Sequence, residues 1–416
     1  MSRKMKDSGV EWIGEIPKEW KISKVKYFVK CLDGKRIPID VGERKSGPYP
    51  YWGAGSITDY VENYIFDEEL ILLGEDGAPF FDYTRPVAFL VNEKIWVNNH
   101  IHVLKPSKSI SSLFLTFFLN AVDYKTYING SILNKLTQNN MKNITIVLPT
   151  FEEQYKIARF LNEKCEKIDS IIKKSLALKD EYRLMKQSII TRSVTRGIVS
   201  ERLMRDSGIA WLGKIPEDWK VYRIANLYQE RSENGLEELP ILTVSINSGV
   251  SDREIADEEK DRVFVRSEDR TKYKRVYPGD LVYNMMRAWQ GAFGAVRVEG
   301  MVSPAYVVAK PKDGIEVDSR YMEALLRTQE ATEEMHRYSR GIVDFRLRLY
   351  WPEFKNIRIC LPPIEEQKEI ADFIDRKSQE IDLLINKKEQ FISELENYKK
   401  SLIYEYVTGK KEVPES

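Results

Sequence analysis

The chain has 416 residues, of which 42% are hydrophobic, so it is long enough to form more than one domain around buried cores. Its 65 lysines and arginines nearly balance its 64 aspartates and glutamates, which excludes a strongly basic chain and makes any nucleic-acid surface local. With three scattered cysteines, no membrane-length apolar run and an N-terminus unlike a signal peptide, the chain is expected to be a cytoplasmic protein with reduced thiols and no membrane span.

The first predicted element is a tryptophan-containing segment that occurs twice. Residues 8–20 read Ser-Gly-Val-Glu-Trp-Ile-Gly-Glu-Ile-Pro-Lys-Glu-Trp, and residues 207–219 read Ser-Gly-Ile-Ala-Trp-Leu-Gly-Lys-Ile-Pro-Glu-Asp-Trp, at an offset of 207 − 8 = 199. Because aromatic side chains bury large areas, Trp12, Trp20, Trp211 and Trp219 are expected to anchor the start of each repeat in its core.

Each repeat continues with a middle of mixed strands and helices. In the first middle, strands are expected at 70–73, 86–91, 95–104 and 143–148 and a helix at 111–122. In the second, strands are expected at 239–246, 280–285, 294–298, 301–309 and 355–361 and a helix at 319–336. Matches at an offset of 205, such as Val97 with Val302, predict that both middles share a fold.

A second repeated motif follows the last strand of each middle. Residues 148–154 read Leu-Pro-Thr-Phe-Glu-Glu-Gln and residues 361–367 read Leu-Pro-Pro-Ile-Glu-Glu-Gln, at an offset of 361 − 148 = 213. This distance exceeds the period of solenoid repeats, so it indicates one plan used twice. The paired glutamates stand at a helix start, where they complement the helix dipole without any catalytic role.

A heptad pattern of five repeats begins after each copy of this motif. Eight of ten seam positions are apolar or aromatic in both helices, and the misfits, which include Lys164 and Lys377, fall at equivalent places. The predicted seam is Ile157, Leu161, Ile168, Ile171, Leu178, Tyr182, Met185 and Ile189 in the first helix and Ile370, Ile374, Ile381, Leu384, Phe391, Leu395, Tyr398 and Leu402 in the second. The pattern predicts an antiparallel coiled coil between helices that stop at Gly197 and Gly409. Two amphipathic helices on separate cores are the alternative.

The sequence therefore predicts an α+β protein. Two similar globular α/β domains are expected, separated by an antiparallel coiled coil of two long helices, with a pseudo-two-fold internal repeat. The expected boundaries are 1–150 and 198–362 for the globular domains and 151–197 and 363–416 for the helices.

With both motifs occurring twice in this order, nearly the whole chain resembles the specificity subunit of type I restriction-modification enzymes. The resemblance implies that each middle is a target recognition domain for one half of a bipartite DNA site, and that the coiled coil sets the gap and docks partners. It implies a non-catalytic subunit that carries two modification (methyltransferase) subunits and restriction/translocase subunits. No cofactor is then expected on this chain, and S-adenosylmethionine, ATP and Mg belong to the partners. An orphan DNA-binding paralogue without enzyme partners and a structural coiled-coil adaptor are the alternatives.

Polar clusters in both middles are candidates for reading double-stranded DNA, because Arg and Lys pair with guanine and Asn and Gln with adenine. In the first middle they are Lys35, Arg36, Asn98, Asn99, Asn134, Lys135, Gln138, Asn139 and Asn140. In the second they are Arg270, Lys272, Lys274, Arg275, Asn284, Arg287, Gln290, Arg340, Arg346 and Arg348. Amides prevail in one middle and guanidiniums in the other, which predicts an asymmetric target. A solvated polar surface is the alternative for each cluster.

Catalytic and metal-binding motifs are missing from the sequence. It has neither an Asn/Asp-Pro-Pro-Tyr/Phe motif for adenine methylation nor a Gly-x-x-x-x-Gly-Lys-Ser/Thr loop for ATP. His100 and His102 alternate along an expected strand, but no Cys or acidic residue is spaced along the sequence to complete a metal site with them.

Overall fold

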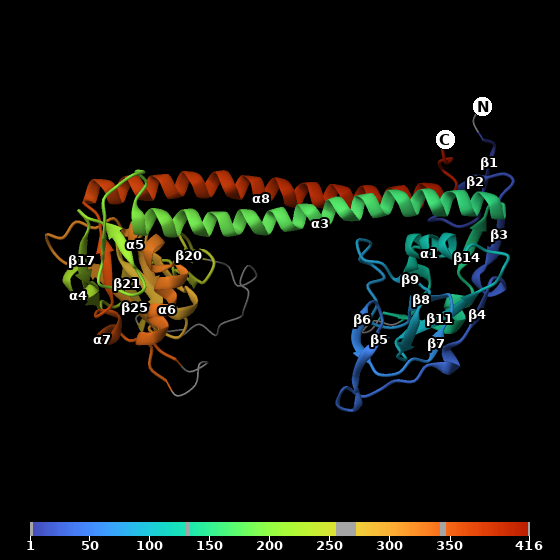
Figure 1. Cartoon of the computed structure of the whole chain (residues 1–416), viewed down its shortest axis with the longest axis horizontal. Coiled ribbons are helices and arrows are strands. Elements are labelled where there is room, and N and C mark those ends of the chain that lie inside the picture. Colours follow the sequence, from blue (N-terminus) through green and yellow to red (C-terminus); the bar gives the residue numbers. More distant parts are fainter. Residues whose placement is uncertain (1–2, 130–133, 255–271, 342–346, 415–416) are drawn as a thin grey trace. The chain divides into compact units, whose positions relative to one another are not determined.

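The computed structural model describes residues 3–129, 134–254, 272–341 and 347–414 (Figure 1). The chain divides into two compact units, Met1–Ala177 with Lys388–Ser416 (unit 1) and Leu178–Lys387 (unit 2). Each unit contains one globular domain and a part of both long helices, α3 (Phe151–Arg196) and α8 (Ile364–Val407). The predicted fold class, two similar α/β domains joined by two long helices, is confirmed.

The centre of unit 1 is an antiparallel sheet covered by the helix α1 (Ser112–Ala121) (Figure 1). Its strand order is β4 (Val29–Cys31), β11 (Ile101–Pro106), β8 (Leu70–Gly74) and β9 (Ala88–Val91). Strand β8 is apolar throughout because both its faces are buried: Ile71 and Leu73 pack with α1, whereas Leu70 and Leu72 face a second core.

That second core lies between the central sheet and a mixed sheet. The order of the mixed sheet is β6 (Ile57–Val61), β5 (Ser46–Trp52), β10 (Lys94–Val97) and β7 (Phe66–Asp67). The strand predicted at 95–104 is therefore two strands in different sheets, because the Asn98 amide donates to the Trp52 carbonyl (3.1 Å) and the chain turns there.

Short elements complete unit 1. Three antiparallel pairs are β1 (Met5–Asp7) with β2 (Glu15–Pro17), β3 (Lys21–Lys24) with β14 (Thr145–Leu148), and β12 (Ile128–Asn129) with β13 (Lys135–Leu136). The helices are α2 (Gln138–Lys142) and the 3-10 turns η1 (Val25–Tyr27), η2 (Asp33–Lys35), η3 (Val41–Glu43) and η4 (Tyr124–Thr126).

Unit 2 repeats the central sheet in the same order. Its strands are β18 (Tyr228–Arg231), β25 (Tyr306–Pro311), β22 (Leu281–Asn284) and β23 (Phe293–Ala295), covered by α5 (Ser319–Leu326) and α6 (Gln329–Tyr338). The helix predicted at 319–336 is thus two helices, because the buried Thr328 caps α6 by accepting from the Ala331 amide. The strand predicted at 239–246 is reduced to the two residues of β19 (Val244–Ser245).

The remaining elements of unit 2 are short. Its pairs are β15 (Met204–Asp206) with β16 (Lys214–Pro216), β17 (Lys220–Arg223) with β26 (Arg358–Leu361), β19 with β20 (Gly249–Val250), and β21 (Lys274–Val276) with β24 (Gly300–Val302). Its short helices are α4 (Ile224–Leu227), α7 (Trp351–Phe354) and the 3-10 turn η7 (Ala288–Gln290).

The two long helices pack antiparallel within each unit. In unit 1, Asp169 pairs with Lys399 at 2.6 Å, and in unit 2, Lys186 pairs with Asp382 at 2.8 Å. The residue numbers of each pair have the same sum, 169 + 399 = 186 + 382 = 568, so one register describes both parts. The predicted pairing and orientation of the helices are confirmed.

One column of the predicted seam is wrong. Ile171, Met185, Leu384, Phe391 and Tyr398 are 43%, 54%, 42%, 39% and 57% exposed. The column one residue later is the buried one, with Ala158, Cys165, Ala371, Ile385, Ile392 and Tyr406, and it alternates with the correctly predicted Leu161, Ile168, Ile374, Ile381 and Leu402. The remaining predicted seam residues Leu178, Tyr182, Ile189 and Leu395 are half-buried. The heptad period alone could not separate the columns because both are apolar near the globular cores, where Ile157 and Ile370 are buried.

The two repeated motifs contact each other where each helix begins. Glu153 accepts hydrogen bonds from Arg3 (2.7 Å) and from the indole of Trp20 (3.2 Å). Glu366 in unit 2 accepts from Arg202 and from the indole of Trp219 (3.1 Å). Trp20 and Trp219 are buried as predicted, but the second glutamate of each motif is more than a partner of the helix dipole.

The glutamine of each motif joins its helix to the globular domain. Gln154 accepts from the Ser111 amide at the start of α1 (2.9 Å), and Gln367 accepts from the Asp318 amide at the start of α5 (3.0 Å). Both glutamines are buried, so each long helix is fixed at its first turn to the helix that covers the sheet.

Candidate nucleic-acid interface

The amide-rich segment of unit 1 lies beside the end of β8. The Leu136 amide donates to the carbonyl of Glu75 (2.7 Å), and Thr137 caps α2 by accepting from the Asn140 amide (3.2 Å). Four of the predicted residues here are exposed, namely Asn134, Lys135, Gln138 and Asn139. Asn140 is half-buried and donates to the Tyr127 carbonyl (2.8 Å), so it holds the segment in place.

The equivalent segment of unit 2 is fixed by the same backbone contact. The Leu349 amide donates to the carbonyl of Met285 at 2.8 Å, and Leu349 stands 349 − 136 = 213 residues after Leu136, the offset of the helix motif. The exposed Arg348 therefore occupies the place of Lys135. The two units present different side chains from one backbone frame.

Glu75, the residue after β8, contacts two of the predicted polar residues of unit 1. Glu75 pairs with Arg36 at 2.5 Å and with Lys135 at 3.3 Å, and Arg36 also donates to the carbonyl of Asn99 (3.3 Å). The Arg36 guanidinium is 15% exposed and is used within unit 1, which disfavours base reading by this residue. Lys35 and Asn99 are exposed beside it, and the Asn98 side chain accepts from the amide of His100 (2.8 Å).

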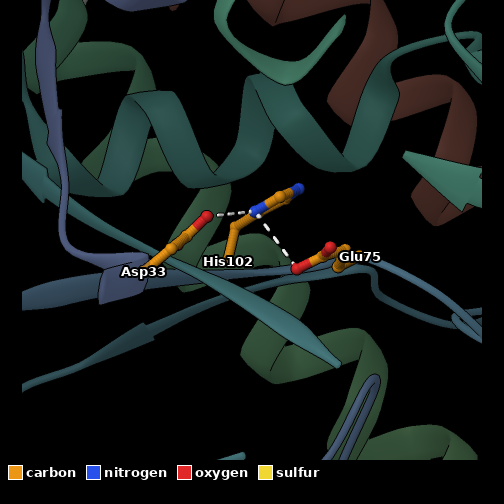
Figure 2. Close-up of side chains that lie close together, drawn as sticks. All are labelled: Asp33, Glu75 and His102. Carbon is orange, nitrogen blue, oxygen red and sulfur yellow. Dashed lines mark hydrogen bonds and ion pairs between the residues drawn. The ribbon is translucent and has the colours of Figure 1, made fainter. Parts of the chain in front are cut away.

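A buried ion network stands behind this segment (Figure 2). His102 Nδ1 lies 2.7 Å from Asp33 Oδ2 and 3.7 Å from Glu75 Oε2, and Nε2 lies 2.8 Å from the Leu136 carbonyl oxygen. Burial raises the pKa of the Asp33 carboxyl, but the hydrogen bonds from His102 and the Val103 amide, with the charges of His102 and Arg36, outweigh it and hold that pKa below its usual range.

Asp33, Glu75 and His102 have the side-chain types of a metal site, and their ligand atoms all lie within 4.8 Å of one another. Both nitrogens of His102, however, contact protein acceptors, and the cations of Arg36 and Lys135 already pair with Glu75. The cluster fits an internal ion network better than a cation site. The sequence spacing showed no acidic partner for His102, because Asp33 and Glu75 come from distant parts of the chain.

In unit 2 several predicted residues are engaged within the unit. Lys274 donates to the Tyr306 carbonyl (2.8 Å), Arg275 pairs with Glu299, and Arg340 pairs with Glu353 at 2.5 Å. Asn284 accepts from the Met286 amide (3.0 Å) and shapes the loop before η7. Arg270 and Arg346 lie outside the described residues.

Three other predicted residues of unit 2 are Lys272, Arg287 and Gln290, and the last of these follows a residue that lines a pocket. Lys272 and Gln290 are exposed, and Arg287 is half-buried. Beside Gln290, Trp289 meets His336 of α6 edge-on at 5.2 Å, and both line the pocket. Contact of these residues with DNA stays a prediction.

The sequence pattern described as the type I restriction modification DNA specificity domain matches residues 17–180 and 216–394, more than half of the chain. The chain belongs to this family. The MjaVIII type I restriction enzyme specificity subunit of Methanocaldococcus jannaschii is 25% identical over 386 residues, 86% of this chain and 85% of that protein. A putative specificity subunit of Haemophilus influenzae is 31% identical over 144 residues, 35% of this chain and 36% of that protein.

A solved structure shares the fold. A chain from a study of complex assembly and conformational transition of the type I R-M system aligns with a TM-score of 0.64 at 13% identity, over 95% of this chain and 99% of that chain. Within the described ranges of the specificity subunit, no helix is both long and apolar enough to cross a membrane.

Sequence reasoning missed the residues that support segment 134–142 of unit 1 in this specificity subunit. Asp33 and Glu75 were not singled out because they are 69 and 27 residues from His102, and nothing in the local sequence links them. The signal that could have found Asp33 is its place just beyond an apolar strand, where a buried carboxylate needs a cationic partner.

Proposed function

We propose that each unit of this specificity subunit reads one half of an asymmetric, bipartite DNA site. The supporting observation is that equivalent backbone positions of the two units carry different side chains. Leu136 and Leu349 make the same backbone hydrogen bond. The exposed residues beside them are amides and Lys135 in unit 1, and Arg348 in unit 2. A common scaffold that carries different polar groups suits two unlike base sequences.

The paired helices are proposed to set the gap between the half-sites and to dock two methyltransferase subunits. The exposed apolar column supports a protein partner: Ile171, Phe391 and Tyr398 in unit 1 and Met185 and Leu384 in unit 2 remain uncovered. A larger exposed apolar patch is a feature of protein-interaction sites.

The subunit itself is proposed to be non-catalytic. S-adenosylmethionine then belongs to the methyltransferase subunits, which flip out a target adenine in each half-site, and ATP and Mg belong to the restriction subunits. An orphan DNA-binding paralogue would bind the same DNA but would not co-purify with a methyltransferase. A coiled-coil adaptor would show no sequence-selective, salt-dependent retention of DNA.

The decisive experiment maps methylated adenines in cells that carry this subunit with its methyltransferase. Two short, unlike sequences with a fixed gap between them, methylated only when the subunit is present, are the expected result. Methylation without a bipartite motif, or the same motif without the subunit, would exclude the proposal.

A further inference from the structure

Residues 134–142 of unit 1, here called the recognition segment, are held by side chains that have no counterpart at the equivalent described positions of unit 2. His102 Nε2 donates to the Leu136 carbonyl (2.8 Å), and Gln138 Nε2 donates to Asp33 Oδ2 (3.2 Å), the oxygen that also contacts His102 Nδ1. The same imidazole therefore links the start of α2 to the turn η2. Because the His102 side chain is 1% exposed, water does not replace these contacts.

The number of protons on His102 decides how many of these contacts form. A carbonyl oxygen only accepts, so Nε2 needs a hydrogen to bind Leu136, and the Asp33 carboxylate likewise needs a hydrogen on Nδ1. The imidazolium satisfies both acceptors. A neutral imidazole has one N–H, and the charged acceptor Asp33 retains it more strongly than a neutral carbonyl does. Loss of the proton therefore leaves the Nε2 lone pair facing the Leu136 carbonyl, and that contact breaks.

The charged groups around the imidazole come from three parts of unit 1. Asp33 of η2 and Glu75 after β8 face Nδ1. Arg36 and Lys135 face the same two carboxylates, with Arg36 at 3.9 Å from Asp33 Oδ2 and Lys135 at 3.3 Å from Glu75 Oε1. Two anions and two cations thus surround His102, and histidine is the side-chain type that gains or loses its charge within the physiological pH range.

Unit 2 has no titratable group at any of the three equivalent positions. Val308 and Val103 are equivalent in the two central sheets, so His102 corresponds to the buried Val307. Met285 takes the place of Glu75 in the shared backbone hydrogen bond, and the strand register places Ser232 where unit 1 has Asp33. The backbone frame is the same, but at these three described positions unit 2 has Val307, Met285 and Ser232 in place of the ion network of unit 1.

We propose that His102 is a positioning residue whose proton holds the recognition segment of unit 1, so that reading of one half-site weakens as the pH rises while reading of the other does not. This step rests on the proposed reading of two half-sites. Sequence discrimination at the two half-sites would then respond differently to a change in pH.

The test measures binding of the purified full chain to three fluorescent duplexes. They carry the mapped site, the site with one half scrambled, and the site with the other half scrambled, at constant ionic strength from about pH 6 to about pH 9. The ratio of affinities for the intact and scrambled duplexes measures discrimination at each half. Discrimination by unit 1 is expected to fall about tenfold, the effect of losing one hydrogen bond to a charged group, while that by unit 2 stays constant.

Two substitutions sharpen the result. His102→Gln should give weak discrimination at that half at every pH, and His100→Gln, which removes the exposed histidine nearby, should retain the pH response. The wild-type pH series stands without either variant, and thermal unfolding checks that His102→Gln is folded. The role of His102 would be overturned, with the proposed function left standing, if both half-sites showed equal pH responses or if His102→Gln kept the wild-type pH response. No discrimination at either half at any pH would overturn the proposed function as well.

Discussion

Glu153 and Glu366 show how single residues determine the two junctions. Glu153 accepts from Arg3 and from the Trp20 indole, whereas its neighbour Glu152 is 78% exposed and pairs with Lys156 one helical turn away. One member of each glutamate pair is therefore part of the fold, and the other lies at the surface.

The first prediction compares these neighbours. Glu153→Ala should lower the free energy of unfolding by about 1–3 kcal/mol, because the buried Trp20 indole loses its acceptor and the half-buried Arg3 loses one of its carboxylate partners and keeps Glu19. Glu152→Ala should change it by less than about 0.5 kcal/mol, since an exposed ion pair contributes little. Urea denaturation followed by tryptophan fluorescence measures both, and Glu366→Ala should reproduce the larger effect in unit 2. Equal effects of Glu152→Ala and Glu153→Ala would show that the helix dipole is the main role of the pair.

Arg348 offers the matching test of DNA reading. It is exposed next to the anchored Leu349, so Arg348→Ala should relax preference in one half-site by about 1–3 kcal/mol, the range for a bidentate contact to a base, and leave the other half unchanged. Lys135→Ala, the equivalent change in unit 1, should affect the opposite half. Binding to duplexes with single-base changes measures this. A uniform loss on all sequences, with a shallower salt dependence, would instead make Arg348 a phosphate contact.

At the scale of elements, neighbouring residues of α8 separate the buried seam from the exposed column. Ile392 is 8% exposed and Phe391 is 39% exposed, both within unit 1. Ile392→Asn should destabilise unit 1 by about 2–5 kcal/mol, because it removes apolar packing and buries an amide. Phe391→Asn should cost less than about 1 kcal/mol but should reduce co-purification of the methyltransferase. Retention of the partner by Phe391→Asn would exclude this column as its docking face.

The elements also show what the sequence could predict. The helices, their antiparallel pairing and the shared middles followed from motifs repeated at fixed offsets, which depend on local sequence. The buried column was misassigned because Ile385 and Leu384, or Ile392 and Phe391, are adjacent and equally apolar, so only the partner helix decides between them. The support for Leu136 was invisible, because hydrogen bonds to a backbone carbonyl leave no mark on the sequence.

Each long helix begins at a glutamate motif and ends beside a tryptophan-containing entry segment. Gly197 follows α3 with a φ of 76°, and a Cβ there would lie 3.1 Å from Glu366 and 3.5 Å from Trp219 of unit 2. Gly409 follows α8 with a φ of 73°, and a Cβ there would overlap Pro17 and Trp20 of unit 1. Each helix thus starts on one globular domain and ends against the entry segment of the other, so a change in helix length acts on both domains.

The last prediction lengthens both helices by one heptad, after Ala177 in α3 and after Lys387 in α8, where the chain divides into its units. Seven residues add about 10 Å of helix and preserve the seam, so the tolerated gap should increase by about three base pairs. The added base pairs also rotate one half-site by about 100° around the DNA axis, so slower methylation at the new gap is expected.

Methylation mapping reads the gap and both half-sites in one experiment. The half-site sequences should stay unchanged, because neither insertion lies in a recognition segment. A heptad in α3 alone is the control: it leaves the ion pairs Asp169–Lys399 and Lys186–Asp382 in unequal registers, so it should impair folding or methylation at every gap. An unchanged gap in the doubly extended subunit would exclude the helices as the measuring device and assign that role to the partner subunits.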